Sequence, residues 1–570
     1  MFTDIVGKIE GMLKRRGTNV AVRFDGIEYT YEELDFLSSR IASFLQINEI
    51  CEENIVAVYM DRSWLSVCTI IGIMRSGAAF LPIEKKTPFD RVLQILEISK
   101  PKMVISDTEL RLDVDLSFVH INQIMSKPNK KLKKVKITAS SLAYVIFTSG
   151  STGEPKGVMI EYGGLSNHVL EKIRILNLGE ESIIAHNASI GFDISIWQII
   201  APLYVGGKIV IFTDDMIFHL KKFVQVLVEE RITVLEVVPT YLNLLIKECK
   251  KSELLSDLQY IISTGQELKR EIVNRWLLKF PDIPIVNAYG PTEASDDIAH
   301  CVITKNDTYD RIPIGIPIDN VKFSINYECN SDTIGELWVS GICVGRGYIG
   351  NEEETKKSFF INIDNGSRIY KTGDLVSLTV DGQYVYHGRK DGQIKVHGNR
   401  VEIEEIENAI ISFHGIDDVA VVYSREKDEI YAVFVATPLV DIGKVKEFLY
   451  SKLPSYMVPM KYIQVHKIPV HLNGKTDNKK VLEMFETGDS YDEKAVHDII
   501  SGIMQIQEFP EDNAWRDDLS ILGLDSLAVI RLIVEIEAIY GIEFEDEYLR
   551  PEIIFNFNKL CDYIKKKKFT

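Results

Sequence analysis

The sequence predicts a multidomain chain of α/β and α+β class: a large N-terminal layered α/β unit, a small α+β unit and a C-terminal helical bundle. The chain has 570 residues, and a single core rarely grows beyond roughly 250–300 residues. β-rich and helical segments alternate in its first third, as in βαβ units. Short β segments and glycine turns dominate from about Ile334, and the last stretch is acidic and helical.

Apolar periodicity places the elements of the N-terminal unit, and their alternation favours largely parallel strands. Strands are predicted at Asn54–Met60, Ala78–Ile83, Met103–Ser106, Ile183–Ala185, Lys208–Phe212, Thr233–Val238 and Tyr260–Ser263, and helices at Ser63–Met74 and Pro88–Ser99.

The second half of the chain reads as two smaller units. Strands Glu336–Ser340, Gln383–Tyr386 and Gln393–Val396 are followed by a helix at Glu402–Phe413 and an antiparallel pair at Val419–Tyr423 and Tyr431–Val435. The polar stretch Phe485–Asp492 is typical of a linker, and Ser526–Tyr540 is the best helix beyond it. We therefore expect units at residues 1–390, 391–484 and 495–570, with a linker at 485–494.

Charge and cysteine usage limit the partners and the compartment. The formal net charge is −18, which argues against nucleic acid as the main partner. Half of that excess lies in residues 489–570, which hold 18 acidic and 9 basic residues. The seven cysteines are scattered without a CxxC pair, which favours a reducing cytoplasm. No signal-type segment is evident, and the longest apolar run is far below the ~20 residues that span a bilayer, so no membrane partner is expected.

The strongest local signal is the loop Thr148–Gly157 (TSGSTGEPKG), which follows a strand-like segment. Its glycines and hydroxyls expose hydrogen-bond donors toward anionic oxygens, and Lys156 adds a positive charge. The loop lacks the GxxxxGK[ST] pattern of a Walker A motif. The sequence therefore predicts a phosphate-binding loop of another kind.

This loop resembles the phosphate-binding signature of adenylate-forming enzymes, specifically the amino-acid adenylation domains of nonribosomal peptide synthetases. The resemblance covers nearly the whole chain, with the motifs in the family's order. The further matching segments are Tyr29–Leu34, Arg75–Ile83, Phe192–Ser195, Asn287–Glu293, Gly335–Leu337, Tyr370–Leu375, Gly388–Gln393, Leu453–Pro459 and Asn473–Lys475.

The resemblance implies ATP and Mg²⁺ as cofactors and assigns a role to each matched residue. Catalytic roles fall to Lys475, Glu293, Thr148 and Lys156, with Glu293 as the implied Mg²⁺ ligand. Asp374 would accept hydrogen bonds from the ribose, and the adenine would lie between two tyrosines. The implied ATP-binding set is Thr148, Ser149, Gly150, Ser151, Thr152, Gly153, Lys156, Tyr289, Thr292, Asp374, Tyr386, Arg389, Lys395 and Lys475.

The resemblance also implies a hinge and a carrier domain. Asp391 matches the hinge about which the small unit rotates with Lys475, and His397 stands where the family usually carries arginine. Leu522–Leu527 (LGLDSL) resembles a carrier-protein attachment site, with Ser526 as the acceptor of 4′-phosphopantetheine. A helix start at Ser526 would place the phosphodiester near free N–H groups. The implied partners are a phosphopantetheinyl transferase and downstream synthetase domains or tailoring enzymes, in secondary-metabolite synthesis.

Asp193 matches the position at which family members hold the α-ammonium of an amino acid. The implied substrate positions are Asp193, Ile194, Trp197, Glu236, Ile262, Thr264, Ala288, Asp296 and Asp297. Uncompensated buried carboxylates are costly, so the three acidic residues beyond Asp193 favour a basic amino acid substrate. The alternative is that Asp296 and Asp297 face solvent and that the substrate is small and polar.

Two other functions are weighed against amino-acid activation with self-loading. An acyl or aryl-acid ligase that uses coenzyme A, or a luciferase-like oxidase, is disfavoured by Asp193 and by the carrier module. A non-catalytic scaffold or carrier partner is disfavoured by the intact Lys475, Glu293 and Asp374. The fold alone would not separate these three.

Overall fold

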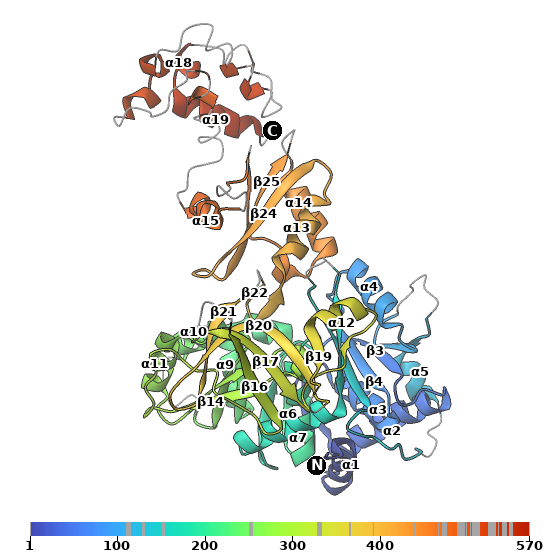
Figure 1. Cartoon of the computed structure of the whole chain (residues 1–570). Helices are drawn as coiled ribbons and strands as arrows, with labels where there is room; N and C mark the ends of the chain where they lie inside the picture. Colours follow the sequence, from blue (N-terminus) through green and yellow to red (C-terminus); the bar gives the residue numbers. More distant parts are fainter. Residues whose placement is uncertain are drawn as a thin grey trace. The chain divides into compact units, whose positions relative to one another are not determined.

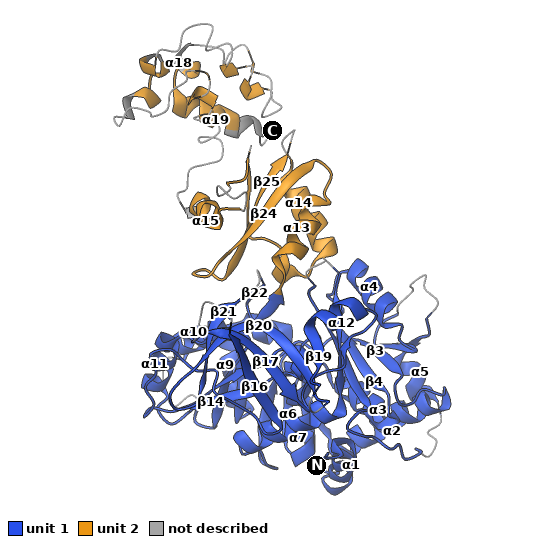
Figure 2. Ribbon diagram, viewed as in Figure 1, with its two compact units in different colours: residues 1–150, 154–400 blue, residues 151–153, 401–570 orange. Residues whose placement is uncertain are grey.

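The structure is a computed structural model of the whole chain (Figure 1). It describes all residues except 1, 110–115, 128–131, 151–153, 250–254, 328–332, 364–365, 391–392, 437–439, 466, 470–475, 487–495, 497–498, 502, 504–512, 523–531, 534, 538–543, 546–550 and 569–570. The chain divides into two compact units (Figure 2). Unit 1 comprises residues 1–150 and 154–400, and unit 2 comprises residues 151–153 and 401–570.

The larger sheet of unit 1 has nine strands among the described residues. Their order is β15 (Ile316–Pro317), β14 (Ala299–Ile303), β13 (Ile285–Tyr289), β12 (Tyr260–Ser263), β11 (Val234–Val237), β9 (Ile183–His186), β10 (Lys208–Ile211), β1 (Val20–Phe24) and β2 (Ile27–Thr30). The pairings from β13 through β1 are parallel, and only the edges are antiparallel. The predicted, largely parallel arrangement is confirmed here.

A second sheet of unit 1 has seven strands in the described part of the chain. Their order is β18 (Gly347–Tyr348), β8 (Lys156–Glu161), β7 (Leu142–Thr148), β4 (Ala79–Ile83), β3 (Ile55–Tyr59), β5 (Met103–Ser106) and β6 (Phe118–His120). The pairings from β7 through β6 are parallel, whereas β8 returns antiparallel to β7. The phosphate loop connects β7 and β8.

Four helices lie between the two sheets and share one apolar core with both. They are α2 (Tyr31–Ile47), α3 (Trp64–Ser76), α6 (Tyr162–Ile175) and α7 (Ile194–Val205). On the outer face of the nine-stranded sheet lie α9 (Leu220–Glu229), α10 (Pro239–Glu248) and α11 (Arg270–Lys279), and α4 (Phe89–Ser99) covers the seven-stranded sheet. Strands buried on both faces read as continuous apolar runs, which is why the sequence located them.

Local sequence signals explain the ends of these helices. At α3, Ser63 forms a capping box with Ser66, and Gly77 ends the helix with a φ of +88°. Only glycine adopts that conformation without strain, and the chain turns there into β4. The predicted helices Ser63–Met74 and Pro88–Ser99 are confirmed as α3 and α4 within a residue or two.

The rest of unit 1 is antiparallel. A five-stranded sheet orders β16 (Val321–Tyr327), β17 (Gly335–Gly341), β20 (Arg368–Leu378) and β19 (Phe359–Ile361), and β21 (Tyr384–Arg389) also pairs with β20. Beyond it, β22 (Ile394–Val396) and β23 (Asn399–Val401) form a two-stranded sheet. Contacts of Arg400 hold this segment to unit 1, so the compact unit extends past residue 390. The domain boundaries proposed above stay predictions.

Unit 2 begins with a small α+β segment, as predicted. Helix α13 (Ile403–Ile411) precedes an antiparallel pair, β24 (Ile416–Ser424) and β25 (Glu429–Ala436), and β26 (Lys461–Gln464) joins β25 in parallel. Along the chain, α14 (Ile442–Lys452) precedes β26 and α15 (Asn478–Glu486) follows it.

The end of unit 2 is helical in its described residues, including α18 (Pro551–Ile554) and α19 (Phe557–Lys568). Its apolar core gathers around Trp515, whose ring meets Phe557 edge-on at 5.2 Å. The predicted helix Ser526–Tyr540 lies largely outside the described residues. Within the described part of the chain, no helix combines the length and apolar character that a bilayer crossing needs.

Candidate active site

The phosphate loop is the tip of the β7–β8 hairpin. Thr148, the last residue of β7, pairs in register with Lys156, the first residue of β8. The Oγ1 atom of Thr148 is buried and has no hydrogen-bond partner in the described part of the chain. A Cβ atom on Gly150 would lie 2.1 Å from the carbonyl oxygen of Glu154, so the tight turn requires glycine there. An orphaned buried hydroxyl beside such a turn fits a phosphate oxygen.

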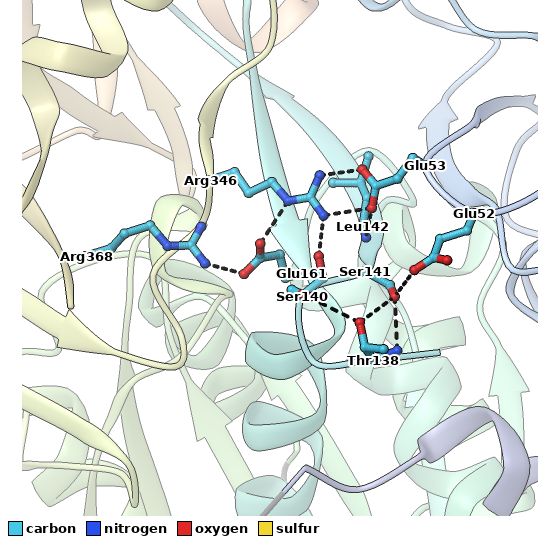
Figure 3. Close-up of polar contacts among 9 residues, drawn as sticks. All are labelled: Glu52, Glu53, Thr138, Ser140, Ser141, Leu142, Glu161, Arg346 and Arg368. Carbon is cyan, nitrogen blue, oxygen red and sulfur yellow. Dashed lines mark hydrogen bonds and ion pairs between the residues drawn. The ribbon is translucent and has the colours of Figure 1, made fainter. Parts of the chain in front are cut away.

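The opposite end of the same hairpin is held by an ionic network (Figure 3). Arg346 donates hydrogen bonds to Glu53 and to Glu161, the last residue of β8. The carboxylate of Glu53 also accepts from the backbone N–H of Leu142, the first residue of β7. The side-chain hydrogen bond from Arg346 holds the pKa of Glu53 below its ordinary value. This network fixes the base of the hairpin and so positions its loop.

Lys156 is buried and already has an acidic partner. Its Nζ donates to Glu354 of α12 (Glu352–Ser358) over 2.7 Å and lies 5.5 Å from the centre of the Tyr348 ring. A direct phosphate contact would therefore have to share this ammonium with Glu354.

Glu293 lies in a short 3₁₀ turn, Thr292–Ala294, and is fully buried. Its carboxylate accepts hydrogen bonds from Arg400 at 2.7 and 3.0 Å and from the Tyr348 hydroxyl at 2.7 Å. Burial acts to raise the pKa of Glu293, but the Arg400 charge and the Tyr348 hydrogen bond bring it below its ordinary value. Glu293 is thus held as an anion, the form in which a carboxylate binds Mg²⁺.

The implied nucleotide residues meet around Asp374 in β20. One carboxylate oxygen accepts from the Tyr289 hydroxyl at 2.5 Å, and the other from Arg389 at 2.9 Å. Arg389 faces Asp374 across the β20–β21 pair. The charge of Asp374 also acts on Lys395, whose pKa is nevertheless lowered by burial. Tyr386 packs against the main core of the unit, in β21.

The implied substrate residues come from the carboxyl ends of neighbouring parallel strands and from the start of α7. Glu236 in β11 pairs in register with Ile262 in β12, Thr264 follows that strand, and Ala288 lies near the end of β13. Ligands bind at such strand ends in open α/β sheets.

Asp193 caps α7 and accepts a hydrogen bond from the N–H of Ile194 at 3.1 Å. Burial raises its pKa, against a hydrogen bond from Thr292. One turn along the helix, the Trp197 indole N–H donates to Glu236 Oε2 over 2.5 Å. Asp193 and Trp197 thus share one face of α7.

Lys172 of α6 lies among the predicted acidic residues. Its Nζ donates to Asp297 Oδ2 over 2.5 Å, lies 3.5 Å from Glu236 Oε1 and sits 4.9 Å from the centre of the Trp197 ring. The side chain is 0% exposed. Asp296 and Asp297 are also buried, so the alternative in which they face solvent is wrong. The premise that these carboxylates lack compensation is corrected too, because an internal lysine neutralises part of the charge.

The three carboxylates around Lys172 differ in ionisation. Burial acts to raise the pKa of Asp297, but Lys172 lowers it below its ordinary value. Burial raises the pKa of Asp296 well above its ordinary value, and that of Glu236 is raised for the same reason against the charge of Lys172. Lys172 and Asp297 therefore form the ion pair, while burial favours the neutral form of Asp296.

Two oxygens of the group have no hydrogen-bond partner among the residues that the structure describes. They are Glu236 Oε1, which lies 3.5 Å from Lys172 Nζ, and Asp296 Oδ2. His168 Nε2 lies 3.3 Å from Asp296 Oδ2, but burial lowers the pKa of His168 to about 3, so that contact is not an ion pair at neutral pH. Burial has the same effect on His300.

Several predicted residues lie outside the described part of the chain: Ser151, Thr152, Gly153, Asp391, Lys475 and Ser526. His397 is described and adopts a φ of +48° in the turn between β22 and β23.

Sequence reasoning missed Lys172, Arg400 and Tyr348. A signal for Lys172 was present, because Leu165, His168, Val169 and Lys172 follow the i, i+3, i+4, i+7 spacing of a buried helix face. A charged residue in such a stripe must have a buried partner.

Fold and site together define a layered α/β protein with a glycine-rich phosphate loop and an acidic cluster at the ends of its parallel strands. The model of the AMP-binding enzyme family matches residues 10–349, and that of the phosphopantetheine attachment site matches residues 494–549. The chain therefore belongs to the AMP-binding enzyme family and carries a phosphopantetheine attachment region. The family expected from the motifs is confirmed.

Curated relatives are peptide antibiotic synthases. The chain is 31% identical to gramicidin S synthase 1 of Brevibacillus brevis over 583 aligned positions, covering 98% of this chain and 52% of that protein. It is 30% identical to zwittermicin A synthase ZmaJ of Bacillus cereus, covering 84% of this chain and 94% of the relative. The chain thus spans about half the length of the first of these relatives.

A solved structure of holo-PA1221, an NRPS protein containing adenylation and PCP domains, shares the fold. The two are 20% identical with a TM-score of 0.76, over 99% of this chain and 97% of that one. NpsA-ThdA, an artificially fused adenylation–PCP di-domain from Klebsiella oxytoca, gives a TM-score of 0.73 at 22% identity, over 85% and 97%.

Proposed function

We propose that the chain activates an amino acid with ATP and then holds it as a thioester on its own carrier region. The observation that carries this proposal is the presence of an AMP-binding enzyme match and a phosphopantetheine attachment match in one chain. In the first step a carboxylate oxygen of the substrate bonds to the α-phosphorus of ATP, and pyrophosphate leaves. In the second, the thiol of the arm on Ser526 bonds to the acyl carbon, and AMP leaves.

The described residues support the first step by their chemistry. The free Thr148 hydroxyl would donate to a phosphate oxygen, and Asp374 would accept from the ribose hydroxyls. Glu293, buried and anionic, would hold Mg²⁺, which when bound neutralises charge on the phosphates. Lys475 would contact the reacting carboxylate and phosphate. Preorganised groups of this kind act where charge builds up in the transition state.

We propose a basic amino acid as the substrate, with Asp193 holding its α-ammonium. Support comes from Glu236 Oε1 and Asp296 Oδ2, two buried carboxylate oxygens without a hydrogen-bond partner among the described residues. A cationic side chain would supply that partner, since a buried polar atom left unpaired is costly. Lys172 already pairs with Asp297 and approaches Glu236 Oε1 to 3.5 Å, so Asp296 Oδ2 is the oxygen that Lys172 leaves to a substrate cation.

The proposed partners follow from the two regions. A phosphopantetheinyl transferase would load Ser526, and downstream synthetase domains or tailoring enzymes would take the bound amino acid. The antibiotic synthases among the relatives support a place in secondary-metabolite synthesis.

Pyrophosphate exchange across a panel of amino acids tests activation. We expect exchange with basic amino acids, and a strictly hydrophobic preference would overturn the basic assignment.

Mass spectrometry after incubation with a phosphopantetheinyl transferase and coenzyme A tests the carrier. One arm is expected on the wild-type chain and none on Ser526→Ala. If the arm is absent and free coenzyme A is acylated instead, the chain is an acyl-coenzyme A ligase. Absence of exchange with any substrate would favour the scaffold.

A further inference from the structure

The buried ammonium of Lys172 lies where the acidic cluster would otherwise receive a substrate cation. It donates to Asp297 and approaches Glu236 to 3.5 Å, and both partners are among the implied substrate positions. It also lies over the ring of Trp197, a third such position. Lys172 itself comes from α6, which contributes no other implied substrate residue.

We propose that Lys172 is a specificity-determining residue that limits the length of the basic side chain the site accepts. The inference rests on the proposed function. Lys172 acts as a built-in counterpart of a long cationic substrate side chain: its ammonium lies over the Trp197 ring, pairs with Asp297 and approaches Glu236 Oε1 to 3.5 Å. A substrate ammonium then finds its partner at Asp296, a carboxyl that interacts electrostatically with Asp193.

The order of the residues along α7 supports this placement. Asp193, the implied partner of the α-ammonium, begins the helix, and Trp197 lies one turn further on, about 5–6 Å along the axis. The Trp197 indole binds Glu236, and its ring lies 4.9 Å from Lys172 Nζ, so Glu236 and the Lys172 ammonium both lie at the level of Trp197, whereas Asp296 interacts electrostatically with Asp193. Asp297 pairs with Lys172 and also accepts a hydrogen bond from the Thr264 hydroxyl at 3.0 Å.

Charge points the same way. Lys172 and Asp297 neutralise each other, and burial favours the neutral form of Asp296. One further cation can therefore be stabilised by ionisation of Asp296, whereas a second ammonium beside Lys172 would meet like charge. Short diamino acids, such as diaminopropionate and diaminobutyrate, are the class that this arrangement selects. Lysine and arginine would overlap Lys172.

The homologous series diaminopropionate, diaminobutyrate, ornithine and lysine tests the proposal by amino-acid-dependent pyrophosphate exchange. For the wild-type chain we expect kcat/KM to fall by about tenfold or more for each methylene beyond the preferred length, the usual discrimination against a group without room. In Lys172→Ala the optimum should move to ornithine or lysine, with the lysine to diaminobutyrate ratio rising about 100-fold. Because this ratio compares two substrates on one variant, partial loss of folded protein does not change it.

Lys172→Met separates volume from charge. Methionine fills much of the same space without the ammonium, so the short-side-chain optimum should persist. Ethylammonium added to Lys172→Ala should restore activity with diaminobutyrate and reduce it with lysine, because it refills the vacated position. If Lys172→Ala does not fold, Lys172→Ala with Asp297→Asn removes the unpaired charge, keeps the space and should show the same shift.

The outcomes divide the two proposals. If the wild-type chain activates basic amino acids and the order of the series is unchanged in Lys172→Ala, the length inference is overturned and the basic assignment stands. If the wild-type chain activates only neutral amino acids, both are overturned.

Discussion

Arg400 donates hydrogen bonds to both carboxylate oxygens of the fully buried Glu293, at 2.7 and 3.0 Å. Arg400 is the last residue of unit 1 and its own carbonyl accepts from Ser149 in the phosphate loop, at 2.9 Å. The implied metal ligand and the loop are thus joined by one residue, through its guanidinium on one side and its backbone carbonyl on the other. In this arrangement a metal ion and a guanidinium compete for the same oxygens.

Arg400→Gln should lower the Mg²⁺ concentration needed for half-maximal pyrophosphate exchange by about three- to tenfold, since a charge-assisted bond is worth ~1.5–3 kcal/mol and only part of it is recovered. Titration with Mg²⁺ at saturating ATP measures this. Tyr348→Phe is the matched control, because it removes a neutral donor from Glu293 and should shift the midpoint less. An unchanged midpoint in Arg400→Gln would mean that Glu293 does not hold the metal.

Tyr289→Phe should raise the KM for ATP by about tenfold with a smaller change in kcat. The substitution removes the hydrogen bond to Asp374 and leaves the one from Arg389, and a bond to a charged group is worth ~1.5–3 kcal/mol. Initial-rate kinetics with varied ATP provide the measurement, and Asp374→Ala should show a larger rise. A change in the amino acid KM alone would place Asp374 away from the nucleotide.

Arg346→Met should destabilise unit 1 by about 1–3 kcal/mol, because Glu53 loses the arginine that pairs with it and Glu161 keeps only Arg368 at the base of the loop hairpin. The midpoint of the first thermal transition should fall, and the KM for ATP should rise with it. The control is Arg231→Met, which breaks an exposed ion pair with Asp257 and should change stability by less than ~1 kcal/mol. Equal effects of the two variants would show that the network does not position the loop.

The apparent affinity for a basic amino acid should rise with pH up to about 7 and then level off. Burial raises the pKa of Glu236 to about 7 against the charge of Lys172, and a bound cation favours the ionised form, so binding releases a proton below that pH. The groups that act on Glu236 are Lys172, Trp197, Asp297 and Asp296. KM for the amino acid measured against pH should lose this step in Glu236→Gln. A KM that rises with pH over the same interval would contradict the assignment.

Patterns in the sequence were sufficient for most of the fold. The buried strands β3, β4, β5, β9, β10, β11 and β12 are short apolar runs between helical stretches, and each was located from that texture. The phosphate loop was also evident, because loop composition is a local property of the chain.

Ion pairs between residues distant in the chain could not be predicted from the sequence. Arg346 bonds to Glu53 across 293 residues, and Arg400 to Glu293 across 107. Each of these arginines reads in isolation as a solvated side chain, and only the packing of strands β7, β8 and β23 gives it a carboxylate to bind.

The sequence by itself determined the family, the order of the regions and the residues that gather at the ends of the parallel strands. The tertiary structure decided how the acidic residues at this site are ionised. Lys172 lies 125 residues from Asp297 along the chain, and only the tertiary fold brings α6 to the segment before β14, where its ammonium lies 2.5 Å from that carboxylate. In the sequence, Glu236, Asp296 and Asp297 suggest a site of uncompensated negative charge. In the folded chain Asp297 pairs with Lys172, burial favours the neutral form of Asp296, and the ionisation of Glu236 can respond to a ligand. The reason is that ionisation depends on burial and on neighbouring charges rather than on composition.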